Sequence, residues 1–248
     1  MAGDSGVDMR SPDQGESALA DADPVNPTAL EALHPLAATE VPVTPSLSHG
    51  EIYTKRGLLT LLVHDPPPGV QRHPAAIVAC GGAFGGVLGP GNGLYQRLGE
   101  RWSERGVSVV RVGYREPNNL DLCAHDLACG VEIARDAGAE RVVVMGHSFG
   151  GAVAVRTAVI MPASVAGVVT FATQSAGCEV AGALGGRSLL LFHGDSDELL
   201  PAEASHVVAA IAGHGEVVML PGDGHLLDKS DDVITQRLDA WLPAVLAL

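Results

Sequence analysis

The residues with the clearest chemical potential stand in one short stretch, Gly-His-Ser-Phe-Gly-Gly, at residues 146–151. A β-branched block precedes it and an alanine-rich segment follows it, which predicts a strand, a sharp turn and a helix. Glycines on both sides allow a turn that is too sharp for residues with a Cβ. The hydroxyl of Ser148 is therefore expected at the tip of the turn, where it could act as a nucleophile.

Two further residues could supply what such a serine needs. A serine hydroxyl reacts poorly until an imidazole takes its proton, and a carboxylate must hold that imidazole in the right tautomer and support its charge. Asp197 follows one apolar block, in the loop His-Gly-Asp-Ser-Asp-Glu, and His225 follows the next, in Gly-Asp-Gly-His. The order serine, acid, histidine is the one expected for a nucleophile on a strand–turn–helix corner. Ser148, Asp197 and His225 are thus the predicted catalytic residues.

A glycine-rich loop, Cys-Gly-Gly-Ala-Phe-Gly-Gly at residues 80–86, could stabilise negative charge on an attacked carbonyl oxygen. With little side-chain cover, its backbone N–H groups can point at an oxyanion. Gly82 and Ala83 are the favoured donors, with the choice between the adjacent amides left open, and Phe149 is the expected donor from the turn. Phe84 and Gln174 are the candidates for lining a substrate pocket.

The motifs Gly-His-Ser-Phe-Gly-Gly, His-Gly-Asp-Ser-Asp-Glu-Leu-Leu-Pro and Gly-Asp-Gly-His resemble the signature corners of the α/β-hydrolase superfamily, above all its small dienelactone-hydrolase-like branch. The resemblance covers residues from about 50 to 248. It implies Ser148 as the nucleophile, Asp197 as the acid and His225 as the general base. Dienelactone hydrolases are known for a cysteine nucleophile, and the serine in this chain favours ordinary ester chemistry. Lipases of this fold often carry His-Gly-Gly-Gly where this chain has Cys-Gly-Gly-Ala.

The elements that must position these residues follow from the apolar pattern. Blocks that are apolar on both faces alternate with segments of helical spacing. This predicts a doubly wound, mostly parallel sheet of about eight strands with helices on both faces. Residues 52–65, before the first such block, predict an antiparallel hairpin. Because ligands bind beyond the carboxyl ends of the strands in such a sheet, the three candidates should meet on one rim.

Residues 174–187, between two of these blocks, form a short connection at a point where many relatives insert a helical lid. We therefore expect no large cap domain and an open site. Such a site suits small or flexible acyl esters better than long-chain lipids.

Residues 1–48 differ in composition from the rest of the chain. They are rich in Asp, Pro, Ala and Ser and have no sustained period of 2 or 3.6, so they offer too little apolar surface to offset chain entropy. We expect a disordered acidic tail at 1–48, solvating rather than docking, and a single domain at 49–248.

The composition disfavours several classes of function. A net charge of −14 with only two lysines leaves no cationic surface for nucleic acid. The chain has no apolar run of membrane-spanning length and no secretory signal at its start, so we expect a cytoplasmic protein without a membrane partner. Its four cysteines lack Cys-x-x-Cys spacing and favour buried, reduced thiols. No histidine stands at metal spacing from His125, so neither a metal nor an organic cofactor is expected.

Several alternatives remain open. Asp195 competes with Asp197 for the acid role, Asp223 is more typical of a turn, and His147 and His193 are expected to pack beside the site. The expected function is hydrolysis of a small carboxylic ester or thioester through an acyl-enzyme. A thioesterase, a peptidase or a carbon–carbon bond hydrolase would share every motif, and a binding protein could keep the same fold without catalysis. Oligomeric state is left open.

Overall fold

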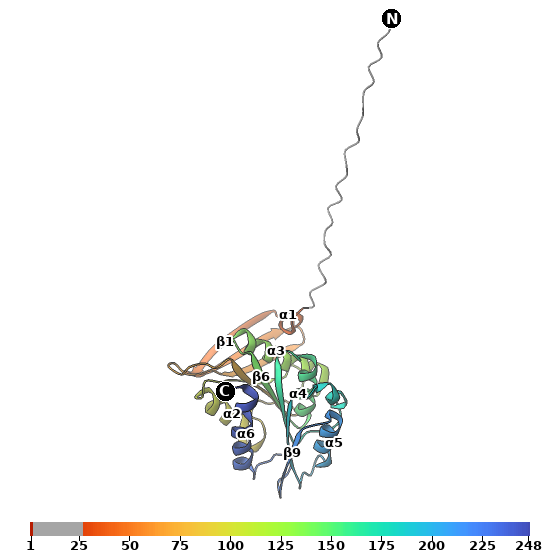
Figure 1. Ribbon diagram of the computed structural model, residues 1–248. Helices are drawn as coiled ribbons and strands as arrows, with labels where there is room; N and C mark the ends of the chain where they lie inside the picture. The colour runs from red at the N-terminus through yellow and green to blue at the C-terminus, as the bar shows by residue number, and fades with distance from the viewer. Residues whose placement is uncertain (2–26) are drawn as a thin grey trace.

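A nine-stranded sheet runs through the described part of the chain, which comprises Met1 and residues 27–248 of the computed structural model (Figure 1). The strand order is β1-β2-β3-β5-β4-β6-β7-β8-β9. The pairs β1–β2, β2–β3 and β3–β5 are antiparallel, and every other pair is parallel. The strands are β1 (Ala37–Thr44), β2 (Leu47–Thr54), β3 (Gly57–His64), β4 (Ala75–Cys80), β5 (Ser108–Gly113), β6 (Arg141–His147), β7 (Val165–Phe171), β8 (Ser188–Gly194) and β9 (Glu216–Leu220).

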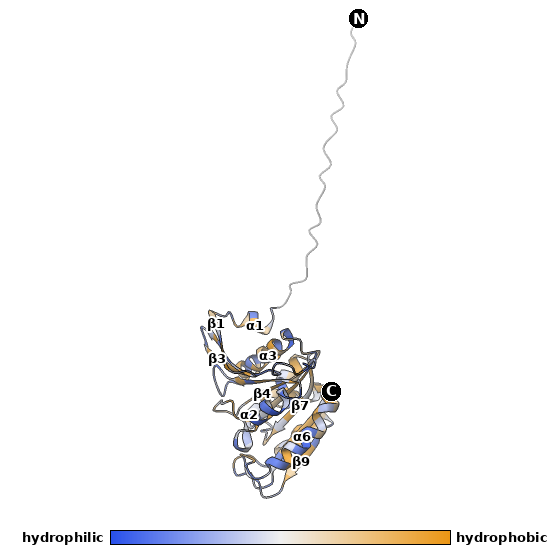
Figure 2. Cartoon of the chain, turned by 90° about the vertical axis from the view of Figure 1, so that its left-hand side faces the viewer, coloured by the Kyte–Doolittle hydropathy of each residue, from blue (hydrophilic) through white to orange (hydrophobic). Residues whose placement is uncertain are grey.

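Helices cover both faces of this sheet. They are α1 (Ala29–Ala32), α2 (Pro90–Ser103), α3 (Leu120–Asp136), α4 (Phe149–Ile160), the 3-10 helix η1 (Glu179–Leu184), α5 (Glu203–Ala212) and α6 (Asp231–Leu246). Buried residues of α3 and α4 share one core cluster with the sheet, and those of α2 and α6 share a second. Figure 2 shows the sheet between α3 and the pair α2 and α6. The predicted doubly wound α/β class is confirmed.

The residues of strand β4 explain why a hydrophobic core forms on each face of the sheet. Every one of its residues is buried, and alternate side chains point to opposite faces. Ala76 and Val78 pack in the cluster with α3 and α4, whereas Ile77 and Ala79 pack in the cluster with α2 and α6. A strand that is apolar at every position is therefore stable only with helices on both sides.

The predicted boundary at residues 48 and 49 is wrong, because ordered structure precedes it. Residues 29–32 form α1, residues 37–44 form β1, and β2 begins at Leu47. β1 is exposed along its whole length and is held by backbone pairing with β2, so burial leaves no periodic signal in its sequence. β1 also contains Pro42, and its register is irregular between Pro42 and Thr44. The rest of the predicted tail, residues 2–26, lies outside the described residues.

The connection between β7 and β8, residues 172–187, contains only η1 and turns, so the expected absence of a large cap domain is confirmed. The predicted hairpin is present as β2 and β3. All four cysteines are buried and free. In the part of the chain that the structure describes, no helix combines the length and apolarity needed to cross a membrane.

Candidate active site

Ser148 occupies the sharp corner between β6 and α4. Its backbone has φ of 57° and ψ of −120°, in a region that residues with a Cβ rarely adopt. The Ser148 amide donates to the carbonyl of Phe171 (2.8 Å), and its carbonyl accepts from the amide of Gly151 (2.9 Å). These two hydrogen bonds stabilise the strained turn. The glycines on both sides of Ser148 predict a sharp turn at this position.

The glycines around Ser148 are required by close contacts with neighbouring segments. A Cβ on Gly146 would lie 1.8 Å from the carbonyl oxygen of Gly150. A Cβ on Gly150 would lie 2.2 Å from the carbonyl oxygen of Gly81, in the loop after β4. On Gly151 it would lie 2.1 Å from Oγ1 of Thr173, in the loop after β7. The turn is therefore packed backbone against backbone within itself and with the loop after β4, and against the Thr173 side chain of the loop after β7.

Asp197 and His225, from the loops after β8 and β9, are joined by a hydrogen bond. Nδ1 of His225 donates to Oδ2 of Asp197 at 2.8 Å, and the carboxylate is fully buried. The other carboxylate oxygen accepts from the amides of Leu199 (2.8 Å) and Leu200 (2.9 Å). With Nδ1 as the donor, Nε2 of a neutral His225 has a free lone pair and can act as a base.

These hydrogen bonds also set the charge of the carboxyl group. Burial opposes ionisation of Asp197, but the Leu200 amide, the His225 ring and the Leu199 amide together hold its pKa below the ordinary value. Asp197 is therefore ionised at neutral pH, and an ionised acid can support positive charge on His225.

The two other aspartates near these loops have different partners. Oδ1 of Asp195 accepts from the Gly222 amide (2.7 Å) and from the neighbouring Ser196 hydroxyl (3.0 Å), and the residue is exposed. Asp223 is buried and accepts from the amide of Gly224 (3.1 Å). Both aspartates therefore organise loop backbone, whereas Asp197 contacts the histidine.

His193 makes a contact to the acid that sequence reasoning missed. Its Nε2 lies 3.2 Å from Oδ2 of Asp197 and 3.4 Å from the carbonyl oxygen of Leu200, and its Nδ1 lies 2.7 Å from Oγ of Ser205. Because both neighbours of Nε2 are acceptors, Nε2 carries the proton and Nδ1 accepts from the serine hydroxyl. Burial lowers the pKa of His193 and favours this neutral form. The sequence feature that could have indicated this contact is the spacing of four residues between His193 and Asp197.

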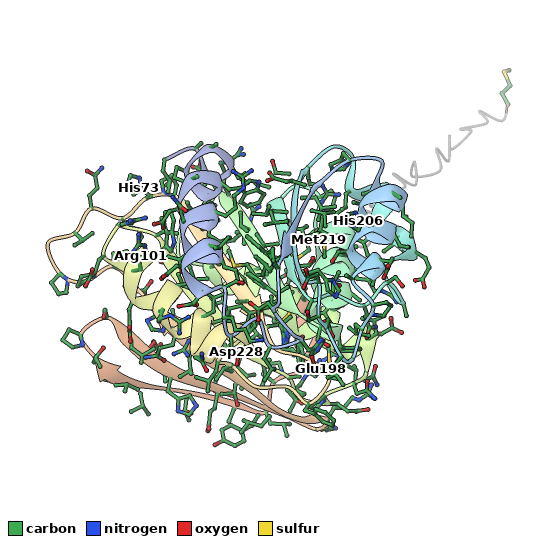
Figure 3. The ribbon with its side chains drawn as sticks, turned by 90° about the horizontal axis from the view of Figure 1, so that it is seen from below. His73, Arg101, Glu198, His206, Met219 and Asp228 are labelled. Carbon is green, nitrogen blue, oxygen red and sulfur yellow. The ribbon has the colours of Figure 1, made fainter. Side chains whose placement is uncertain are left out.

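The loop that carries His225 is also held from two other directions. Its amide donates to Oε2 of Glu198 (3.2 Å), and its carbonyl accepts from Nε2 of His147 (2.9 Å). The rings of His147 and His225 lie with their centroids 5.0 Å apart. Figure 3 labels Glu198 and Asp228, which belong to the loops after β8 and β9. Ser148, Asp197 and His225 follow the carboxyl ends of β6, β8 and β9 and therefore lie on one rim of the sheet. Asp197 and His225 are hydrogen-bonded to each other, whereas the Ser148 hydroxyl makes no hydrogen bond among the described residues.

The glycine-rich loop after β4 lies against the nucleophile corner. A Cβ on Gly82 would lie 3.6 Å from the Cβ of Ser148. Gly82 pairs with Gly85 in an isolated antiparallel bridge, and its carbonyl accepts from the Gly85 amide (3.0 Å). The amides of Ala83 and Phe149 donate to no acceptor within the described residues. Phe149 is the first residue of α4, where the helix dipole favours negative charge.

A small cavity of about 160 Å³ opens between this loop and β6. It is lined by Gly81, Gly82, Gly85, Gly86, Val87, Leu88, Gly89 and His147. The predicted pocket residues do not line it: Phe84 is fully exposed at the tip of the loop, and Gln174 donates to the carbonyl of Ala176 (2.8 Å) in the loop after β7. Substrate contact by these two residues stays a prediction.

A larger cavity of about 430 Å³ is lined by parts of β1, β2, β3, β5 and α3. None of the predicted catalytic residues lines either cavity, but the smaller one is lined by His147, which precedes Ser148, and by Gly82, which lies against it. We therefore place the candidate site at the smaller cavity. The described residues contain no group of three or more His, Cys, Asp or Glu side chains placed to hold a metal ion.

Neither protein-family models nor curated proteins match the chain. Solved structures do match it. Est1E from Butyrivibrio proteoclasticus has a TM-score of 0.67 at 17% identity and covers 81% of this chain and 99% of its own. An α/β serine hydrolase without lid from Xanthomonas campestris has a TM-score of 0.62 at 20% identity, with 82% and 99% covered. A dienelactone-hydrolase-like promiscuous phosphotriesterase from metagenomic libraries has a TM-score of 0.62 at 15% identity, with 85% and 98% covered.

These matches extend over nearly the whole of each solved chain, and one of them is described as lacking a lid, in line with the short β7–β8 connection described above. At such identities the similarity concerns the fold. The chain therefore has the fold of the α/β serine hydrolases, in the form that lacks a lid.

Proposed function

We propose that the protein is a serine hydrolase that cleaves small carboxylic esters or thioesters through an acyl-enzyme. The observation that carries the proposal is the buried hydrogen bond between Asp197 and His225, on the rim where Ser148 occupies a strained turn. A strained nucleophile turn costs folding free energy and is retained where it serves a reaction. Est1E, which has the same fold, is also known with bound ferulic acid, a small carboxylic acid.

In the proposed reaction, Nε2 of His225 removes the proton from the Ser148 hydroxyl as Oγ attacks the carbonyl carbon of the substrate. The resulting tetrahedral intermediate collapses when His225 returns the proton to the leaving alcohol or thiol. A water molecule then attacks the acyl-enzyme by the same route, which releases the acid and restores Ser148. Ionised Asp197 stabilises the imidazolium in both steps.

The oxyanion of the intermediate needs two N–H donors. We propose the amide of Phe149 as one donor, because it is free and begins α4. For the other donor we propose the amide of Gly82 or Ala83, because neither donates to an acceptor within the described residues; in the Gly82–Gly85 pair the Gly82 carbonyl accepts from Gly85. The loop that carries Gly82 and Ala83 packs through Gly81 against Gly150, the residue that follows Phe149 in α4.

A small substrate suits the surroundings of Ser148. No lid covers the rim, and the adjoining cavity of about 160 Å³ is well below the 300–1,000 Å³ typical of drug-sized ligands. Little apolar surface is therefore available to bury a long acyl chain.

The proposal is tested with a fluorophosphonate probe and p-nitrophenyl acetate. We expect wild type to be labelled and to hydrolyse the ester, and Ser148→Ala to lose labelling and at least about 10³-fold of turnover. Ser46→Ala, in the turn between β1 and β2, is the matched control and should behave as wild type. A folded wild-type protein that is neither labelled nor active would overturn the proposal and favour a binding protein on the same fold. A panel of thioesters, peptides and diketones separates the other reactions that share this machinery.

A further inference from the structure

His147, next to Ser148, has a tautomer that its neighbours determine. Its Nε2 lies 2.9 Å from the carbonyl oxygen of His225, which can only accept a hydrogen bond. Nε2 therefore carries the proton. In a neutral imidazole the other nitrogen is then an acceptor, so Nδ1 has a free lone pair.

The ring stays neutral at physiological pH. Burial lowers the pKa of His147 to about 4, against the opposing effects of the His225 carbonyl and the Asp197 charge. At pH 7 Nδ1 is thus unprotonated, and it accepts from no donor within the described residues.

Nδ1 of His147 lies close to Gly82, a second residue of the lining of the small cavity beside the nucleophile. A Cβ on Gly82 would lie 3.8 Å from Nδ1, and both residues line the cavity of about 160 Å³. The other lining residues are glycines, Val87 and Leu88, which offer no polar side chain. A ligand in this cavity would therefore meet one side-chain acceptor in a lining of backbone and apolar groups.

The position of the cavity indicates which part of a substrate it receives. In the reaction proposed above, on which this inference rests, the leaving group lies beside His225 because it takes the proton from Nε2. The cavity is lined by Gly81, Gly82, residues 85–89 and His147, and by no residue of the loops that carry Asp197 and His225. Because the leaving group lies beside His225, we infer that the acyl part of the substrate occupies this cavity.

We propose that this cavity is an acyl specificity pocket for short acyl groups that carry a hydroxyl, and that Nδ1 of His147 accepts a hydrogen bond from that hydroxyl. At about 30 Å³ for each water-sized group, the cavity holds about five non-hydrogen atoms. This size fits 2- or 3-hydroxyacyl groups of three or four carbons. An alkyl group of the same shape would displace water from Nδ1 without replacing its hydrogen bond, and sites built around a hydrogen bond discriminate against such analogues.

The test compares phenyl esters in two isosteric pairs: 2-hydroxypropanoate with 2-methylpropanoate, and 3-hydroxybutyrate with 3-methylbutyrate. We expect wild type to favour the hydroxy ester of at least one pair by about tenfold or more in kcat/KM. His147→Phe, which lacks the acceptor, should bring that ratio to about one or below. His147→Gln offers an amide oxygen and should retain part of the preference. Circular dichroism confirms that each variant is folded.

Each outcome decides a different point. Hydrolysis of p-nitrophenyl acetate without a preference for either hydroxy ester overturns the pocket but leaves the serine hydrolase proposal standing. A preference that persists undiminished in His147→Phe overturns the role of Nδ1. A hydroxyl preference seen only in the alcohol part, with 2-hydroxyethyl against propyl esters, overturns the assignment to the acyl group. Should neither variant fold, the wild-type ratios still decide whether the pocket selects hydroxyacyl groups.

Discussion

The parallel strands β4–β9 and the antiparallel strands β1–β3 belong to one sheet but have opposite surroundings. Every residue of β4 is buried, whereas every residue of β1 is exposed. The parallel part ends in loops that pack backbone against backbone at Gly81, Gly146 and Gly150. The candidate site thus depends on loops whose backbones are in close contact, whereas the outermost strand β1 contributes mainly backbone pairing.

The largest effect is expected from glycine substitutions that contrast the two parts. Gly150→Ala places a Cβ 2.2 Å from the Gly81 carbonyl oxygen, so two backbones must separate, and we expect a loss of at least about 3 kcal/mol of unfolding free energy. Gly50→Ala in β2 is the control, because its Cβ would meet Leu61 at an ordinary 3.6 Å. Urea unfolding measures both. Equal effects would contradict the contrast.

The pH dependence of the unfolding free energy tests whether the antiparallel part contains a buried titratable side chain. His64 on β3 has its pKa lowered to about 4 by burial and by the charge of Arg111, which Glu100 opposes. The unfolded chain binds this proton near pH 6.5 and the folded chain does not, so the stabilisation is complete above pH 6.5 and is lost as the pH falls towards 4. Between pH 7 and pH 5 this amounts to about 2 kcal/mol.

Urea unfolding at pH 7 and pH 5 measures this loss, and His64→Leu should make the decrease smaller by about the same amount. An unchanged pH dependence in the variant would show that His64 does not contribute. His147 on β6 has a pKa lowered to about 4 in the same way, mainly by burial, so both parts of the sheet should lose stability over the same range.

A smaller effect is expected from His193, whose Nε2–H faces Asp197 from the buried end of β8. His193→Phe should lower kcat about tenfold with little change in KM, because the acid loses one donor while substrate contacts remain. Ser205→Ala removes the partner of Nδ1 instead and should have a weaker effect in the same direction. A change confined to KM would contradict a positioning role for His193.

The smallest effect is expected on the exposed strand. Val41 and Val43 of β1 are each 57% exposed, so replacing either with Thr should change the unfolding free energy by less than about 0.5 kcal/mol. Val78→Thr on buried β4 is the matched control, and its buried hydroxyl should cost about 1–3 kcal/mol. Thermal unfolding of the three variants gives the comparison. A large loss at Val41 would mean that β1 supports the core.

The same contrast explains how far the sequence could be interpreted. Strands such as β4 and β6 were predictable because burial on both faces demands apolar residues throughout. β1 was not, because pairing through backbone atoms demands no particular side chain. Ser148, Asp197 and His225 could be proposed because each follows a predictable strand. The contact of His193 with Asp197 depends on the path of a loop, and the tautomer of His147 depends on a carbonyl 78 residues along the chain.

Pro42 affects whether the edge strand β1 can pair with strands of other copies of the protein. β1 ends the nine-stranded order, and an uncovered strand at the end of a sheet is a template on which another chain can polymerise. A proline in such a strand removes one outward N–H, and the irregular register beside it bends the template. The β1 end of the sheet is thereby protected against fibril-like growth, a safeguard that strands paired on both sides, such as β4 and β6, do not require.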